Sequence, residues 1–215
     1  MHLTNRLTLL ALAATTTTTL ASPILQARDG PVKVTADQLG QIAPKLKSCD
    51  RAKDAECATA DNAALFISNS FDTYKITSPA VAAALIATMA KESGEFVYAH
   101  NVSPGVPGQG TRNMQSPKFN KMYLDSLTDP AFKAEKDAAG DDPVKVLRAL
   151  NTYGNYDFGS AAWFLTSQCK ESADALDKAK ADQKGWDDYV KCVGATPGDG
   201  RLDYWKKAVQ VLGVK

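Results

Sequence analysis

Residues 78–96 read SPAVAAALIATMAKESGEF, which is the clearest helical pattern in the chain. Ser78 is a natural helix N-cap, and Pro79 follows at the first helical position, where a proline is tolerated. The run over residues 81–90 is apolar on nearly all sides, as expected of a helix buried inside a domain. Gly94 suits a C-terminal cap. We therefore predict a buried central helix from Ser78 to about Glu92.

Helical periodicity continues on both sides of this helix, and no long alternating strand pattern appears. Between residues 98 and 116, prolines and glycines are interleaved with polar residues, which indicates a structured loop or a short irregular hairpin. The predicted class is mainly α, with a small irregular or β element next to the central helix. The other predicted helices span residues 36–47, 61–71, 117–126, 143–152, 159–169, 172–180, 186–193 and 199–212.

The composition is that of an ordinary globular protein. The chain has 215 residues, 44 % of them hydrophobic, and its 25 Lys and Arg residues against 24 Asp and Glu residues give a formal charge of +1. These values argue against a disordered chain, a collagen-like repeat or a membrane bundle. The near-zero charge also argues against nucleic acid as the main partner, because that binding requires a basic face. A single domain over residues 36–215 is large enough to bury a core.

The first residues have the layout of a secretory signal peptide. Arg6 precedes a short apolar run over residues 7–14, and Thr19 and Ala21 place small residues at the −3 and −1 positions of a cleavage site. A membrane span would need roughly 20 apolar residues. We therefore predict a signal peptide over residues 1–21, a flexible segment over 22–35, and a secreted, extracellular protein without a membrane partner. A merely disordered N-terminus is the alternative.

Four cysteines follow the predicted signal peptide: Cys49, Cys57, Cys169 and Cys192. An even count in an oxidising compartment indicates two disulfides, for which three pairings are possible. We favour Cys49–Cys57 and Cys169–Cys192, because each bond would join neighbouring helical segments. The chain has no CxxC or HxxxH spacing and few histidines, so we expect no metal and no cofactor.

Glu92, at the inner end of the apolar helix, is the main candidate for chemistry. Burial beside apolar neighbours penalises the charged form of a carboxyl, so Glu92 is expected to hold a proton that it can donate to a glycosidic oxygen. Glu95 lies three residues on, and a helix break at Gly94 would turn it outward. The alternative is that Glu92 and Glu95 are solvated residues at a helix end.

Two stretches resemble a known superfamily. Residues 92–96 (ESGEF), Ser103-Pro104 and residues 108–117 (GQGTRNMQSP) have the order and spacing found in the lysozyme-like superfamily, particularly in the soluble lytic transglycosylases. Residues 155–165 (NYDFGSAAWFL) are similar to a helix of those transglycosylases and to one of the plant-type chitinases. The resemblance covers about a third of the chain after the signal peptide and implies a lysozyme-like helical domain.

The resemblance also implies roles for individual residues. Glu92 would be the general acid, and the loop over residues 108–115 would form one wall of a sugar-binding groove. A second carboxylate would be Asp157 or Glu95, although Asp157 can instead cap a helix. Arg112 can bind either the ligand or a nearby carboxylate. Further residues expected to contact the sugar are Tyr98, Ser103, Gln109, Asn113, Gln115, Tyr156 and Trp163, the last of which can equally belong to the core.

Two functions therefore remain open at this point. The first is a secreted, monomeric glycan-cleaving enzyme of the lysozyme, transglycosylase or chitinase kind, acting on an N-acetylglucosamine-containing polymer, either peptidoglycan or chitin. The second is a catalytically inactive, lysozyme-like secreted protein that binds a cell-wall glycan or a host protein, as an effector does.

Overall fold

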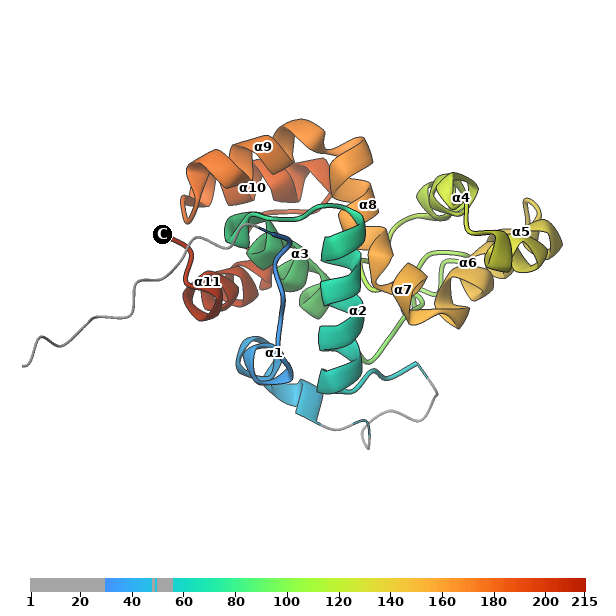
Figure 1. The fold of residues 1–215 in the computed structure, drawn as a ribbon, viewed down its shortest axis with the longest axis horizontal. Helices are drawn as coiled ribbons and strands as arrows, with labels where there is room; N and C mark the ends of the chain where they lie inside the picture. Colours follow the sequence, from blue (N-terminus) through green and yellow to red (C-terminus); the bar gives the residue numbers. More distant parts are fainter. Residues whose placement is uncertain (1–29, 48, 50–55) are drawn as a thin grey trace, which may run out of the picture.

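The computed structural model describes residues 30–47, 49 and 56–215, and these residues form a mainly helical fold without a sheet (Figure 1). The predicted class is confirmed. In chain order the elements are α1 (Ala36–Ile42), the 3-10 helix η1 (Pro44–Lys47), α2 (Ala60–Thr73), α3 (Pro79–Glu92), α4 (Pro117–Ser126), the 3-10 helix η2 (Pro130–Phe132), α5 (Lys133–Ala139), α6 (Pro143–Thr152), α7 (Gly154–Asp157), α8 (Gly159–Gln168), α9 (Lys170–Ala179), α10 (Gln183–Cys192) and α11 (Arg201–Leu212).

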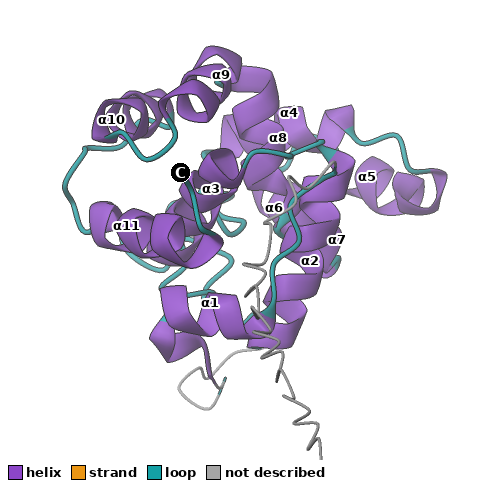
Figure 2. Cartoon of the chain, turned by 60° about the vertical axis from the view of Figure 1, so that its left-hand side comes forward, coloured by secondary structure: helices purple, strands orange, loops and turns teal. Residues whose placement is uncertain are grey.

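Helix α3 is the centre of the molecule. The Ser78 side chain caps it by accepting a hydrogen bond from the Val81 N–H, and Pro79 occupies its first position, as predicted. All residues from Ala80 to Ala90 are buried. Helix α11 packs along α3, and α8 and α9 contact it as well (Figure 2). Burial on every side explains why this helix has almost no polar face.

A second group of helices lies on the opposite side of α2. Helix α6 packs against α4, α5 and α7, and α4 also contacts α8, so this group is joined to the core (Figure 1, right). The segment between α3 and α4 connects the two groups. It contains two isolated β-bridges, His100–Gly110 and Gly110–Gln115, which are the small β element expected next to the central helix.

Both disulfides have the predicted pairing, Cys49–Cys57 and Cys169–Cys192. The second bond ties the end of α8 to the end of α10. Cross-links of this kind are typical of proteins folded in oxidising compartments. None of the helices within the described ranges is long and apolar enough to cross a membrane. The predicted signal peptide lies outside the described residues.

Removing the longer cross-link should destabilise the protein. The Cys169–Cys192 bond closes a loop with a sequence separation of 23 residues. Loop-closure entropy predicts that the Cys169→Ser/Cys192→Ser variant loses about 3 kcal/mol in free energy of unfolding, measured by urea denaturation. The Cys49→Ser/Cys57→Ser variant, with a separation of 8 residues, is the comparison and should lose somewhat less. An unchanged urea midpoint for the first variant would contradict the expectation.

Several elements differ from the sequence-based expectation. The predicted helix over 36–47 ends at Ile42 and continues as η1, because Pro44 cannot donate a backbone hydrogen bond. Helices η2, α5 and α7 were missed: α5 buries only Ala139 and α7 is a single turn, so neither produces a clear apolar period. The segment predicted as flexible over 22–35 is packed where it is described, with Val32 and Val34 buried. Residues 22–29 of that segment lie outside the described range.

Candidate active-site groove

Glu92 lies where two surface hollows meet. One hollow, of about 300 Å³, is bounded by α3, α8, α10 and the first residue of α11; the other, of about 330 Å³, is bounded by the end of α3 and by residues 98–103. Glu92, Gln109 and Met114 line both of them. We call the two hollows together the Glu92 groove. Glu92 is the only carboxylate among the described residues that line it.

The abrupt end of α3 places Glu92 at the rim of this groove. Three successive residues after the Ser93 cap, Gly94, Glu95 and Phe96, have φ values of 60°, 63° and 66°. Such left-handed conformations are strained for residues with a side chain and persist only where the surroundings hold them. The Ser93 hydroxyl accepts a hydrogen bond from the Phe96 N–H at 2.8 Å and donates one to the Met89 carbonyl at 2.6 Å.

Arg201 is the ion-pair partner of Glu92. It is the first residue of α11, and its Nη2 donates to Glu92 Oε1 in an ion pair, while its guanidinium also pairs with Asp199. The side chains of Arg201 and Glu92 are only 11 % and 21 % exposed. Glu92 is therefore in contact with a cation, a neighbour that the apolar residues before it in the sequence did not indicate. The pairing arises because α11 packs along α3 and brings its first residue to the last residue of α3.

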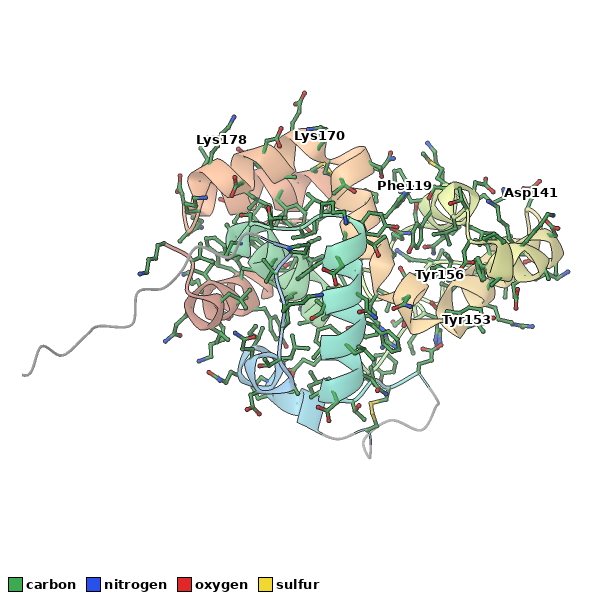
Figure 3. The ribbon with its side chains drawn as sticks, in the orientation of Figure 1. Phe119, Asp141, Tyr153, Tyr156, Lys170 and Lys178 are labelled. Atoms are coloured by element: carbon green, nitrogen blue, oxygen red, sulfur yellow. A yellow bond between two sulfur atoms is a disulfide. The ribbon has the colours of Figure 1, made fainter. Side chains whose placement is uncertain are left out.

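Tyr189 on α10 contributes a neutral hydroxyl to the same hollow. Burial raises the pKa of Tyr189 to about 12, and the negative charge of Glu92 adds to this rise. The phenol therefore stays protonated at any pH at which the protein would act. Phe119 on α4, labelled in Figure 3, and Phe164 on α8 have ring centroids 4.9 Å apart and supply apolar lining of this hollow.

One wall of the groove is a network of side-chain amides. Gln109 Nε2 donates to the Met114 carbonyl at 3.1 Å, and Asn113 Nδ2 donates to Gln115 Oε1 at 3.2 Å. Behind them, Gln115 Nε2 donates to Asn120 Oδ1 at 2.8 Å, and Asn120 in turn donates to the Gly108 carbonyl. The amides are therefore held in place before any ligand arrives. Gln109, Asn113 and Gln115 line the groove as expected from the sequence.

Gly110 fixes the position of this wall. A Cβ atom at this position would lie 2.4 Å from the Ala99 carbonyl oxygen and 2.7 Å from a Leu147 methyl group. We expect Gly110→Ala to lower the free energy of unfolding by about 2 kcal/mol, the usual cost of overpacking. Thermal denaturation of Gly110→Ala beside Gly40→Ala tests this, because Gly40 lies in α1 with no atom near its Cβ position. A Gly110→Ala variant as stable as the wild type would show that the wall can move at no cost.

Arg112 and Asp157 form a buried ion pair outside the groove. Arg112 Nε donates to Asp157 Oδ2 at 2.7 Å, and its Nη groups donate to the carbonyls of Phe96 and Glu56 at 2.8 and 2.6 Å. Burial raises the pKa of Asp157 to about 6, although the Arg112 charge acts in the opposite direction. Both residues line a third hollow of about 540 Å³, which shares His100, Asn101 and Gln109 with the Glu92 groove. The sequence allowed Arg112 to bind either a ligand or a nearby carboxylate, and in the structure it binds the carboxylate of Asp157.

The remaining candidates divide into two sets. Tyr98 and Ser103 line the groove beside Glu92. Glu95 is not turned outward as predicted: it is buried, and it accepts hydrogen bonds from the Lys45 N–H at 2.6 Å and the Tyr204 hydroxyl at 2.9 Å. Tyr156 lies on the α6–α7 side (Figure 3), in different hollows, and donates to Asp129. Trp163 is a core residue, 7 % exposed.

Sequence reasoning missed Arg201, Tyr189, Phe119 and Phe164. A signal for Arg201 does exist: it stands at the first position of a helix, where the helix dipole disfavours a cation. No comparable signal marks the other three, because aromatic residues at helical spacing are usually core residues. In the part of the chain that the structure describes, no group of three or more His, Cys, Asp and Glu side chains is arranged to hold a metal ion.

Comparison with known proteins gives one informative match. The chain is 41 % identical over 157 residues to a bifunctional dioxygenase–epoxy alcohol synthase of Fusarium oxysporum (strain Fo5176). The match covers 71 % of this chain but only 12 % of the relative, so the chain corresponds to a small part of that protein. No family model matches the chain, and no solved structure matches it.

Proposed function

We propose that the protein is a secreted glycan-cleaving enzyme acting on an N-acetylglucosamine-containing polymer of a cell wall, with Glu92 as the general acid. One observation carries this proposal. Glu92 stands at the junction of two hollows, so a polysaccharide lying along the groove passes directly over its carboxyl. The two disulfides favour an oxidising compartment, in keeping with the predicted signal peptide.

The lining of the groove suits an acetamido sugar. The side chains of Gln109, Asn113 and Gln115 offer amide donors and acceptors. Phe119 and Phe164 offer apolar surface for the carbon-bound hydrogens of a sugar ring. This combination of a preorganised polar wall and an aromatic face is typical of small-molecule sites.

The presence of one carboxylate favours a reaction with a single acid. Arg201 donates a hydrogen bond to Glu92 Oε1. In the proposed reaction, the other carboxyl oxygen, Oε2, carries the proton that is transferred. Glu92 gives this proton to the glycosidic oxygen as the bond from that oxygen to the anomeric carbon breaks. A hydroxyl or amide oxygen of the same sugar then bonds to the anomeric carbon, and an attacking hydroxyl returns its proton to Glu92. This is the transglycosylase kind of chemistry, in which one residue is first acid and then base.

The second candidate is a glycan-binding protein without turnover. The Glu92–Arg201 ion pair favours it, because a paired carboxylate is a poorer proton source than a free acid. The oxygenation named for the Fusarium relative is not proposed for this chain, since the match covers so little of that protein.

Incubation with defined glycans separates the two candidates. The purified protein is mixed with N-acetylchitohexaose or with peptidoglycan, and products are identified by mass spectrometry. Shorter products support the enzyme, and products lacking one water per cut indicate closure by the substrate's own hydroxyl. Binding by calorimetry without any product supports the binding protein. Neither binding nor products would reject both.

A further inference from the structure

We infer that Arg201 is a positioning residue that holds the Glu92 carboxylate in an ion pair at the rim of the groove, so that proton donation by Glu92 depends on this pair. The inference rests on the proposed function and adds a regulating partner to the same carboxyl. It starts from the placement of both residues. Glu92 is the last residue of α3 and Arg201 is the first residue of α11.

Each of the two charges is disfavoured by its own helix. The carbonyl end of a helix carries partial negative charge and disfavours an anion, and the N–H end disfavours a cation. Glu92, an anion, therefore stands at the helix end that disfavours negative charge, and Arg201, a cation, stands at the helix end that disfavours positive charge. Because α11 packs along α3, the two residues are brought into contact. Each side chain then provides the opposite charge that stabilises the other side chain, which its own helix end disfavours. The contact is mostly buried, so solvent screens it little.

The other charged and titratable groups around Glu92 do not replace Arg201. Lys91 on α3 and His100 on the following loop line the second hollow, and the Lys91 ammonium lies near Gly200, but neither residue forms an ion pair with Glu92 among the described residues. Tyr189 on α10 is a neutral phenol. Asp199 shares the Arg201 guanidinium and limits how strongly that cation acts on Glu92. Only Arg201 contacts the Glu92 carboxyl in an ion pair within the described part of the chain.

The Glu92–Arg201 ion pair has opposite effects on the binding of a proton by Glu92 and on the release of that proton to the substrate. A cation next to a carboxyl favours the ionised form of that carboxyl over the protonated form. Once Glu92 is protonated, the same charge favours release of the proton to the leaving oxygen, because the ion pair re-forms. Loss of Arg201 should therefore widen the pH range of activity and reduce its maximum.

The pH profile of kcat/KM on N-acetylchitohexaose tests this inference. For Arg201→Gln, we expect the pH at which kcat/KM declines on the alkaline side of the profile to rise by about one unit, and the maximum value of kcat/KM to fall about tenfold. Arg201→Lys retains the charge and should keep the pH of this decline near its wild-type value. Lys206→Gln, an exposed cation on the same helix, is the control and should leave the whole profile unchanged. Circular dichroism verifies that each variant folds.

A purely structural role would give another result. If kcat/KM of Arg201→Gln were lowered by the same factor at every pH, and the pH of its alkaline decline were unchanged, the inference would be overturned. A wild-type protein without turnover would instead reject the proposed function. In that case carbon-13 NMR of the Glu92 side chain decides the remaining question. A change in the pH at which this carboxyl gains its proton, on replacing Arg201 by Gln, supports the pairing, and an unchanged pH overturns it.

Discussion

Replacing Glu92 by glutamine is expected to lower the cleavage of N-acetylglucosamine oligosaccharides by roughly 10²–10⁴-fold, the usual contribution of a general acid. The amide has nearly the shape of the carboxyl but cannot donate a proton of comparable acidity. Its oxygen can still accept a hydrogen bond from Arg201, so the groove should keep its form. The loss should therefore appear in kcat, with binding of the oligosaccharide largely retained.

Two comparisons make this result interpretable. Glu171→Gln makes the same chemical change on the exposed face of α9 and should have wild-type activity. Calorimetric binding to Glu92→Gln shows whether the groove is intact. A reduction of less than about threefold in a folded Glu92→Gln protein would remove Glu92 from the mechanism, because no general acid contributes so little.

Replacing Arg112 by methionine is expected to lower the free energy of unfolding by about 3–5 kcal/mol at pH 7, the cost of breaking a buried ion pair from one side. The change leaves Asp157 without its cation in a site where both side chains are at most 5 % exposed. It also removes the donors that satisfy the Phe96 and Glu56 carbonyls. Urea denaturation measures the loss, and Arg148→Met, at an exposed position on α6, should cost less than about 1 kcal/mol.

The pH dependence of stability reports on the burial of Asp157, which raises the pKa of this carboxyl although the Arg112 charge lowers it. The pKa of Asp157 is raised from the ordinary 3.8 to about 6 in the folded protein, so the folded state binds this proton more tightly than the unfolded state. The stabilisation from this group is therefore complete below about pH 4 and is lost as the pH rises to about 6. The loss amounts to about 3 kcal/mol at 1.36 kcal/mol per unit. A wild-type stability that rises by this amount over the same interval, relative to Asp157→Asn, would contradict the assignment.

The central helix and its approximate end could be predicted from the sequence because the signals are local. Ser78 and Pro79 mark the start, and the uninterrupted apolar run marks the burial. The disulfide pairing was also predictable, since each bond joins segments close along the chain. The resemblance led us to expect a wall over residues 108–115, and Gln109, Asn113 and Gln115 do line the hollow beside Glu92, although their role in sugar binding stays a prediction.

The charge environment of each acidic residue could not be predicted, because tertiary packing determines it. Arg201 lies 109 positions beyond Glu92, and Asp157 lies 45 beyond Arg112. Neither spacing produces a periodic pattern. Glu95 was expected in solvent because a glycine precedes it, yet the left-handed turn directs it inward toward Lys45 and Tyr204. Weakly apolar segments such as α5 likewise fold where neighbours cover them.

The bond between Cys169 and Cys192 joins two helices that both line the groove. Phe164 on α8 and Tyr189 on α10 face the same hollow, and the bond ties the ends of their two helices. Glutathione keeps such thiols reduced in the cytosol, and disulfides persist in oxidising compartments. The redox state of the surroundings would thus decide whether these two walls are covalently joined.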